Sequence, residues 1–505
     1  MVLDEDFSPI KVGIDQFYGI EINDFAVTVA KTALWIAESQ MMKETEDILL
    51  MSLDFLPLKT NAYIIEKNAL DVDWNEIIDK KKLSFMIGNP PFRGMSYQTD
   101  EQKQDIARIC PNRNIDYVSC WYYKAIEYIQ NTSIKCAFVS TSSITQGEQV
   151  EAVWQPLYKN YKLSIDFAYR EFKWSSEASL KAQVYCVIIG FSANVSSKEK
   201  NIYVDSSVIK AKNINPYLID GDIIFIESRK KPLSEDTPIL QNGGKPTEGG
   251  FLILSETEKE ELVKKNPAVK QFLRPYMMGK DFIERKPRYC IWLVNANPTE
   301  LKKCPEILER VQKVRDYRAN SKKAATRKKA ETPTLFDEVR ECSFDYVAIP
   351  KVSGGNRRYI PMDYLSKDII PGDKLFMIQN SSLYLFGVLM SNVHMSWMRL
   401  TASYLSTSYS YSSSVVYNNF PWPKPSEEQK NKISETAQAI LNARALYPNS
   451  SLADLYDPLT MPVELKKAHI ANDKAVMQAY GLSIKDTSEA DCVAALLKMY
   501  QDLTK

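Results

Sequence analysis

The sequence predicts an α/β domain at its N-terminal end, followed by an α+β domain and a small helical C-terminal domain. Residues 1–195 alternate short apolar runs with amphipathic helical segments, the pattern of an α/β domain with a parallel sheet. Residues 236–424 hold short strand-like runs separated by Gly and Pro turns, and residues 425–505 carry helical patterns around a Pro-bearing loop. Residues 196–235 are irregular and polar, so we predict a connector there.

The elements of the first domain follow from the periodicity of its apolar residues. We expect one helix at Asp24–Met41, which has an acidic start and a wide apolar face, and a second helix at Ile115–Ile129. Strands are expected at the β-like runs Phe17–Ile22, Ala62–Glu66, Leu83–Ile87, Cys136–Ser140, Leu163–Ala168 and Val184–Phe191.

Composition narrows the class of protein. Of the 505 residues, 45% are hydrophobic and 25% charged, as in ordinary globular proteins, and no apolar run is long enough to span a membrane. The eight cysteines include no CxxC pair and there are only two histidines, so we expect no metal on this chain and a cytoplasmic location. Because the formal net charge is only +1, any nucleic-acid surface must be a local patch.

The strongest chemical signal is Asn89-Pro90-Pro91-Phe92, directly after a predicted strand. The Asn89 side-chain carbonyl and the Pro90 backbone carbonyl can accept hydrogen bonds from an exocyclic adenine amine, whose lone pair is otherwise delocalised into the ring. Pro91 helps to stiffen the turn, and Phe92 can stack on the base. The alternative is a Pro-rich turn with a buried Phe, but ligands of open α/β sheets bind at the C-terminal ends of strands, which favours a catalytic role.

Two other strand ends carry candidate cofactor contacts. Glu21 ends a strand-like run, and an acidic residue there can accept hydrogen bonds from a ribose diol; a helix cap or a surface residue is the alternative. After the next run, Asn68 or Asp71 can reach the edge of an adenine ring while Leu70 packs on it, although an ordinary strand-to-loop turn explains this segment nearly as well. The candidate cofactor residues are Glu21, Ile22, Asn68, Ala69 and Leu70.

An aromatic pair is a candidate for stacking on a base. A base that leaves a duplex needs an aromatic face to replace the stacking it lost. Phe172 and Trp174 can each supply such a face. Core or interface packing is the alternative role for both rings.

The second domain carries the candidate DNA contacts. Leu301–Ala330 holds eleven basic against three acidic residues, so we predict a basic helix laid along a phosphate backbone, with a solvated charged helix as the alternative. Polar residues of Lys351–Arg358 and Ser406–Asn419 are candidates for base-edge contacts. The expected DNA-binding residues are Lys322, Lys323, Arg327, Lys328, Lys351, Arg357 and Arg358.

These motifs together resemble a known family. The segments QFYGIEINDFAVTVAKTALWIAESQM, IGNPPFRG, FVSTSSITQGEQV and FKWSSEASLKAQVYCVIIGF are similar to the methyltransferase domain of the MmeI-like family, the large type IIL restriction–modification enzymes. INPYL, GGKPTEGGFLILS, ATRKKAETPTLF, IPKVSGGNRRYIP and YSYSSSVVYNNFPWP resemble its target-recognition domain. LADLYDPLTMPVELKKAH resembles its C-terminal helical domain, so the likeness covers essentially the whole chain.

The resemblance implies a fold and a reaction. The fold is an incomplete class I S-adenosylmethionine-dependent methyltransferase sheet of Rossmann-like type, occupying residues 1–195. The implied reaction is methyl transfer from S-adenosylmethionine to the N6 atom of a flipped adenine in double-stranded DNA of a bacterium. Glu21 would match the family's acidic cofactor motif, Asn68 to Leu70 the adenine-contacting motif, and Asn89 to Phe92 the catalytic motif.

The family's Gly-rich cofactor loop and its N-terminal nuclease are not visible in this sequence. In this fold, the strand that leads into that loop lies between the strands carrying Glu21 and Asn89. We therefore expect two unpaired interior strand edges and weak or absent cofactor binding by the chain alone. We expect a second polypeptide to supply the missing segment; the alternative is an inactive DNA-binding specificity fragment or remnant. Phe at position 92 and the long recognition domain disfavour methylation of RNA or protein.

Overall fold

The computed structural model describes residues 10–50, 52, 61–174, 184–194, 198–405 and 407–505. Residues 175–183, which belong to the segment FKWSSEASLKAQVYCVIIGF, and position 406 of the expected recognition loop lie outside the described residues. In the described part of the chain, no helix combines the length and the hydrophobicity needed to cross a lipid bilayer.

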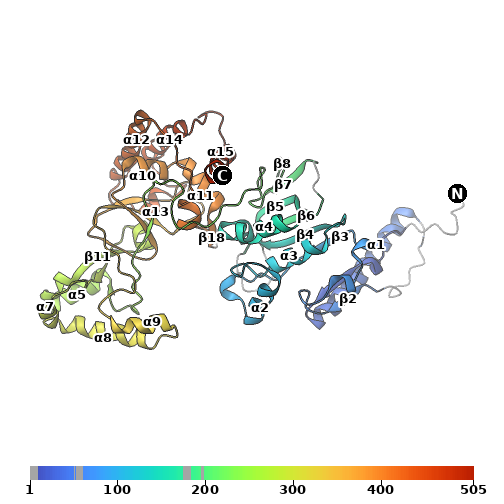
Figure 1. Ribbon diagram of the computed structural model, residues 1–505, viewed down its shortest axis with the longest axis horizontal. Coiled ribbons are helices and arrows are strands. Elements are labelled where there is room, and N and C mark those ends of the chain that lie inside the picture. Colours follow the sequence, from blue (N-terminus) through green and yellow to red (C-terminus); the bar gives the residue numbers. More distant parts are fainter. Residues whose placement is uncertain (1–9, 51, 53–60, 175–183, 195–197, 406) are drawn as a thin grey trace. The chain divides into compact units, whose positions relative to one another are not determined.

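The chain forms two compact units (Figure 1). Unit 1 comprises Met1–Ile144 and Ala152–Asp222, and unit 2 comprises Thr145–Glu151 and Ile223–Lys505. The domain boundaries expected from the sequence stay predictions.

Unit 1 contains a mixed β-sheet. Its strands are β3 (Phe85–Gly88), β4 (Lys135–Thr141), β5 (Ser164–Trp174), β6 (Val184–Ser192), β7 (Lys200–Val204) and β8 (Ser207–Ala211). Among the described residues they are ordered β3-β4-β6-β5-β7-β8. β3 and β4 are parallel, but β6 runs antiparallel to both β4 and β5. The predicted strands are confirmed. The prediction of a parallel sheet is wrong, because β6 lies between β4 and β5 and runs antiparallel to both.

A hairpin extends this sheet where the sequence predicted a connector. β7 pairs parallel with β5, and β8 pairs antiparallel with β7. Tyr169 on β5 stacks on Tyr203 of β7, with 4.3 Å between ring centroids and 9° between ring planes. The prediction of irregular chain is therefore wrong for Lys200–Ala211. β8 is the edge strand of this sheet and is mostly exposed, so the hairpin can form without a continuous apolar run.

A second, smaller sheet lies near the N-terminus. β1 (Tyr18–Glu21) and β2 (Tyr63–Glu66) pair in parallel with Glu21 opposite Glu66, and α1 (Asp24–Leu49) connects to β1. The Asn23 side chain accepts a hydrogen bond from the Ala26 amide at 3.0 Å and caps α1. α1 runs past the predicted end at Met41, since the following residues are mostly good helix formers. It ends at Leu49, and the next residue, Leu50, has the left-handed conformation.

Among the described residues of unit 1, β1 and β3 each have one side that pairs with no other strand. β1 pairs only with β2, and on the other sheet β3 pairs only with β4. Apolar side chains near these edges are exposed, including Phe85 at 70% and Ile87 at 84%. Unpaired backbone groups beside exposed apolar side chains form a template for a further strand. The expectation of two open strand edges agrees with this arrangement.

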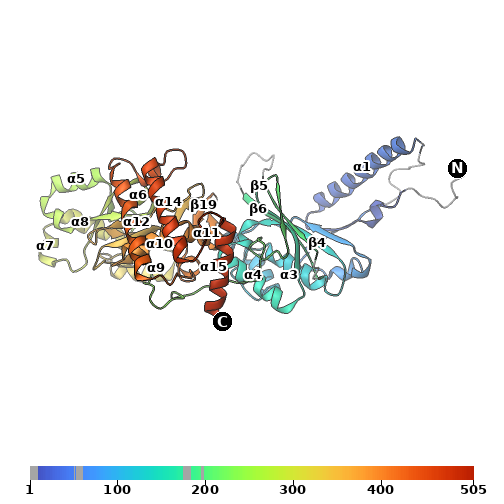
Figure 2. The same ribbon diagram turned by 90° about the horizontal axis from the view of Figure 1, so that it is seen from above.

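Three helices complete unit 1: α2 (Asp100–Ile109), α3 (Ser119–Tyr128) and α4 (Gly147–Asn160), whose first residues belong to unit 2. Tyr122 of α3 contacts the rings of Phe138 on β4, Trp154 on α4 and Phe191 on β6, at centroid distances of 5.3–5.4 Å. These rings are buried and pack α3 and α4 on the sheet. Figure 2 shows the two helices beside the strands. The helix predicted at Ile115–Ile129 is confirmed with a later start at Ser119.

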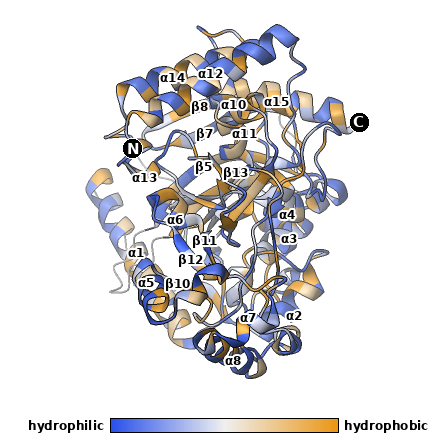
Figure 3. Cartoon of the chain, turned by 90° about the vertical axis from the view of Figure 1, so that its left-hand side faces the viewer, coloured by the Kyte–Doolittle hydropathy of each residue, from blue (hydrophilic) through white to orange (hydrophobic). Residues whose placement is uncertain are grey.

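Unit 2 contains three small sheets in its described residues, ordered β10-β12-β11-β16, β15-β13-β17-β9 and β14-β19-β18. The strands are β9 (Gln241–Asn242), β10 (Ile253–Leu254), β11 (Leu273–Met277), β12 (Arg288–Ile291), β13 (Tyr346–Pro350), β14 (Val352–Gly354), β15 (Asp363–Leu365), β16 (Ile370–Pro371), β17 (Leu375–Gln379), β18 (Ser403–Leu405) and β19 (Ser408–Ser410). β13 is buried along its whole length and appears hydrophobic in Figure 3.

Helices surround these sheets and form the C-terminal part. They are α5 (Glu256–Lys265), α6 (Gly279–Glu284), α7 (Pro298–Lys302), α8 (Pro305–Ala319), α9 (Ala324–Lys328), α10 (Leu383–Leu389), α11 (Asn392–Thr401), α12 (Glu427–Ala445), α13 (Leu452–Leu455), α14 (Val463–Ala479) and α15 (Glu489–Thr504). The predicted helical C-terminal region is confirmed. The prediction of a single basic helix over Leu301–Ala330 is wrong. This segment is divided into the helices α7, α8 and α9, and Pro305 begins α8.

Candidate functional site

The corner Asn89–Phe92 follows β3 immediately, at its C-terminal end. Asn89 is exposed, Pro90 is buried and Phe92 is half-buried, so the amide of Asn89 is not enclosed in the core. Gly88 allows the close approach of the neighbouring strand, because a Cβ atom there would lie 3.2 Å from the ring of Phe138. The corner therefore presents the Asn89 side chain on a stiff backbone anchored by a buried proline.

The structure brings two of the predicted aromatic residues to this corner. The ring of Trp174, at the end of β5, meets the ring of Phe92 edge to face, with 6.5 Å between centroids and 86° between planes. Phe172 lies beside Trp174, with 6.4 Å between centroids. Trp174 is 39% exposed, so part of its surface is accessible. Residues more than 80 positions apart in the sequence thus form one aromatic wall at the corner.

Three polar residues that sequence reasoning missed hold the chain after the corner. The Tyr117 amide donates to the Arg93 carbonyl at 3.0 Å, and Gln98 Nε2 donates to the Ile115 carbonyl at 2.8 Å. Asp116 accepts hydrogen bonds from the Met95 amide and from the Ser143 hydroxyl, and burial raises its pKa. For Asp116 and Tyr117, polar groups inside the apolar run Ile115–Ile129 were the only signal in the sequence, and Gln98 lies outside that run.

Glu21 lies at the C-terminal end of β1, as predicted. Its Oε1 atom accepts hydrogen bonds from the amides of Ile22 at 2.9 Å and Asn23 at 3.2 Å. The carboxylate is half-buried, and the parallel register places it opposite Glu66, the last residue of β2. The C-terminal end of β1, which carries Glu21, therefore lies beside the turn that follows β2.

The turn after β2 is closed by its own side chains. Asn68 Oδ1 accepts from the Leu70 amide at 3.0 Å, and Asn68 Nδ2 donates to Asp71 at 2.9 Å. Leu70 is 2% exposed, which corrects the expectation that its side chain packs on a cofactor ring: it belongs to the protein core. Asn68 and Ala69 are both partly exposed and remain candidates for ligand contact.

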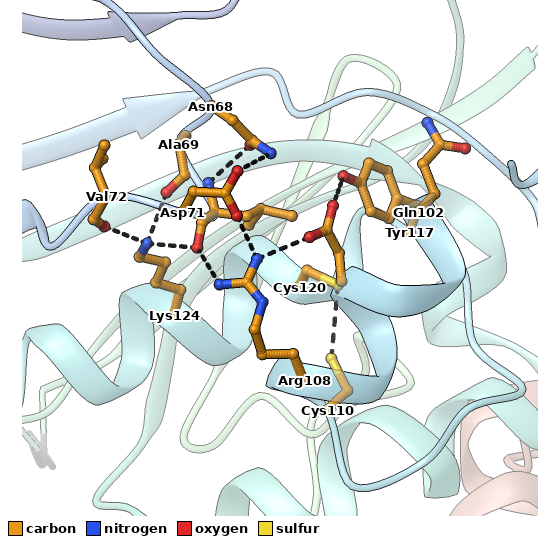
Figure 4. A network of polar contacts seen from close by, with 12 residues as sticks. Asn68, Ala69, Asp71, Val72, Gln102, Arg108, Cys110, Tyr117, Cys120 and Lys124 are labelled. Carbon is orange, nitrogen blue, oxygen red and sulfur yellow. Dashed lines mark hydrogen bonds and ion pairs between the residues drawn. The ribbon is translucent and has the colours of Figure 1, made fainter. Parts of the chain in front are cut away.

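Two cations brace this turn from the neighbouring helices (Figure 4). Lys124 of α3 donates to the carbonyls of Ala69 at 2.7 Å and Leu70 at 3.0 Å, and also to that of Val72. Arg108 of α2 donates to the Leu70 carbonyl at 3.2 Å. Burial lowers the pKa of Lys124, whereas the hydrogen bond to Asp105 raises that of Arg108. Backbone carbonyls rather than carboxylates are the main partners of Lys124, so it fixes the turn's shape.

A polar pocket of about 520 Å³ adjoins this turn. Asn68 and Asp71 contribute one part of its lining, and the polar face of α2 contributes the rest. The lining residues are Asn68, Asp71, Glu101, Gln104, Asp105 and Arg108. The sequence prediction found Asn68 and Asp71 but missed the four residues of α2, whose amphipathic pattern is typical of any surface helix.

The basic residues predicted to bind DNA divide into two groups in unit 2. Lys322, Lys323 and Lys328 lie at or beside α9 with exposed side chains, and Arg327 there donates to the carbonyls of Ser321 and Lys322 at 2.9 Å. The exposed lysines can reach an external phosphate.

The second group is engaged within the protein. Lys351 donates to Asn242 at 2.6 Å and lies over the ring of Phe376, and burial lowers its pKa. Arg357 is half-buried, with 3.5 Å between its Nη1 atom and the Ser353 hydroxyl. Arg358 pairs with Asp473 at 3.7 Å. A guanine edge would have to compete with these internal partners.

Comparison with known proteins identifies the family. Residues 3–204 match the model "MmeI, DNA-methyltransferase domain", residues 220–424 match "MmeI, target recognition domain" and residues 425–505 match "MmeI, C-terminal domain". The chain belongs to the MmeI family. This agrees with the resemblance inferred from the motifs.

A solved structure and a curated protein support membership of the MmeI family. The structure of the type IIL restriction–modification enzyme MmeI in complex with DNA is 42% identical, with a TM-score of 0.90 over 98% of this chain and 67% of that one. DNA methyltransferase A of Bacillus subtilis (strain 168) is 38% identical over 501 residues. The alignment covers 98% of this chain but 56% of that relative, so the chain spans little more than half of the curated protein.

Proposed function

We propose that this chain carries the methyl-transfer and target-recognition parts of a site-specific adenine-N6 DNA methyltransferase of a restriction–modification system. The observation that carries the proposal is the exposed corner Asn89–Phe92 at the end of β3, with the Trp174 ring against Phe92. Membership of the MmeI family supports double-stranded DNA as the substrate and S-adenosylmethionine as the donor.

The corner explains how an adenine amine becomes a nucleophile. The Asn89 side-chain oxygen and the Pro90 carbonyl accept the two N6–H groups, which draws the nitrogen toward sp³ geometry and frees its lone pair. S-adenosylmethionine, when bound, supplies a methyl group on a sulfonium. As the new N–C bond forms, the C–S bond breaks and one N6 proton is released. A base inside a duplex cannot reach the corner, so the adenine must leave the stack and rest against Phe92 or Trp174.

The residues present fit part of the proposed cofactor. Glu21 ends β1 and Asn68 follows the neighbouring parallel strand β2, so both polar side chains lie at the C-terminal edge, where nucleotides bind in α/β sheets. Glu21 would hold the ribose hydroxyls and Asn68 the adenine edge, with Ile22 and Ala69 contributing backbone contacts.

We also propose that a second polypeptide supplies the strand and the Gly-rich loop that complete this site. The open edges of β1 and β3 and the exposed side chains of Phe85 and Ile87 support an added strand between the two sheets. In unit 2, the exposed Lys322, Lys323 and Lys328 suit phosphate contacts. The same open edges also favour a second candidate function. In that case the sheet stays incomplete, and the chain binds DNA without transferring a methyl group.

The proposal is tested with the protein isolated from its bacterial host by an affinity tag, so that any polypeptide completing the sheet is retained. The preparation is incubated with S-adenosylmethionine labelled in the methyl group and duplex DNA, and the DNA nucleosides are separated by mass spectrometry. We expect the label in N6-methyl-2′-deoxyadenosine only, and no transfer by the chain purified free of partners.

Other products would decide against the assigned role. Label in a cytosine product, in RNA or in protein would overturn the adenine-N6 assignment. Sequence-specific DNA binding by the tagged preparation without any label transfer would favour the DNA-binding chain.

A further inference from the structure

The turn after β2 and the corner after β3 are joined by a continuous chain of hydrogen bonds. The Arg108 guanidinium forms an ion pair with Asp71 of the turn. The same nitrogen of Arg108 donates to Asp105, which also lies on α2, at 2.7 Å. Tyr117 then donates its hydroxyl to the other oxygen of Asp105 at 2.6 Å. The backbone amide of Tyr117 donates to the carbonyl of Arg93, the residue directly after Phe92.

The links at Asp105 and Tyr117 are suited to transmitting a position, whereas the side chains of the Arg108–Asp71 pair are half-exposed. Tyr117 is 5% exposed, and its ring packs edge to face on Trp121 at 5.3 Å, so its hydroxyl and its amide are held in fixed relation. Burial raises the pKa of Tyr117, and the hydroxyl therefore stays a donor at physiological pH. One carboxylate oxygen of Asp105 accepts from the Arg108 guanidinium, and the other accepts from the Tyr117 hydroxyl. These two hydrogen bonds leave the carboxylate little freedom to rotate.

We propose that Arg108, Asp105 and Tyr117 form a positioning relay that couples the cofactor turn Asn68–Val72 to the catalytic corner Asn89–Phe92. Seating an adenine edge at Asn68 then fixes Asp71 and Arg108, and through Tyr117 the backbone after Phe92. This inference rests on the proposed function for its meaning. The coupling itself is a property of the folded chain and can be measured without cofactor or catalysis.

The relay is tested by amide hydrogen exchange of the full chain carrying Tyr117→Phe. This change removes one hydroxyl and keeps the ring that packs on Trp121. We expect the amides of Leu70 and Asp71 in the turn, and that of Tyr117 itself, to exchange faster by on the order of tenfold. Asp105→Asn, which keeps the size of the side chain but removes its charge, should accelerate the same two segments.

Tyr123→Phe is the matched control. Tyr123 lies on α3, which begins two residues after Tyr117, and it is buried to a similar extent. It donates its hydroxyl to the Val153 carbonyl at 3.0 Å, outside the relay. Tyr123→Phe should leave the exchange of the turn unchanged. Unchanged exchange of the turn in Tyr117→Phe, or equal acceleration in Tyr123→Phe, would overturn the relay.

A kinetic measurement on the tagged preparation separates positioning from general destabilisation. Tyr117→Phe should raise the KM for S-adenosylmethionine and lower kcat together, whereas Tyr123→Phe should change neither. If the wild-type preparation transfers no methyl group, the proposed function fails, and the exchange result alone still decides the relay.

Discussion

Replacing Asn89 with alanine is expected to lower methyl transfer by at least roughly 100- to 1000-fold, the loss typical of removing one polar group that acts on the reacting atoms. DNA binding should remain nearly intact. Asn89 is exposed and lies outside the core, so its removal leaves packing unchanged, while the adenine amine loses its side-chain acceptor. The measurements are initial rates of labelled methyl transfer and equilibrium binding of target DNA by the tagged preparation.

Asn75→Ala provides the matched control, because Asn75 is an exposed asparagine of the same unit whose side chain donates to Asp73 of its own turn. Its transfer rate should equal that of the wild type. A parallel loss of transfer and DNA binding in Asn89→Ala would refute the catalytic role, as would full activity.

Replacing Arg318 with methionine is expected to destabilise the recognition region by about 3–5 kcal/mol. Arg318 on α8 is fully buried, and its guanidinium donates to five backbone carbonyls at 2.8–3.0 Å. The acceptors are the carbonyls of Pro246, Thr247, Lys329, Thr332 and Leu335. Methionine fills the space but leaves these carbonyls without their donors, so the loops on either side of α8 lose their connection.

The loss is measured as a lower denaturant midpoint for protease resistance of residues 246–335. Arg315→Met is the control, since Arg315 is exposed one helical turn earlier on α8, and its stability should stay within about 0.5 kcal/mol of the wild type. Similar midpoints for the two variants would show that the buried hydrogen bonds contribute little.

Arg318 also illustrates what the sequence could not predict. It stands in the segment Leu301–Ala330, which holds eleven basic residues and whose composition indicates a solvated helix face. Its partners nevertheless come from loops about 70 residues away and from the chain after α9. The burial of Leu70 is hidden for the same reason, because α2 and α3, which cover the turn, lie farther along the sequence. Tertiary contacts of this kind leave no periodic signal.

The corner at Asn89 was predictable because its evidence is local. An apolar run predicts β3, and the rigid Asn-Pro-Pro-Phe turn follows it directly, so one short segment gives the position of the corner and the chemistry that we propose for it. The pairing directions of the sheet were not predictable, since an apolar run carries no information on whether its neighbour is parallel. The contact between Phe92 and Trp174 depends on those pairings, and only the structure brings the two rings together.

The central claim is that this corner receives an extruded adenine, and the most direct test is a structure of the tagged preparation with target DNA and S-adenosylhomocysteine. The account predicts the adenine N6 atom at about 2.7–3.2 Å from both the Asn89 side-chain oxygen and the Pro90 carbonyl, with the base against Phe92 or Trp174. A target adenine that stays stacked in the duplex, or that turns its N6 atom away from Asn89, would contradict it.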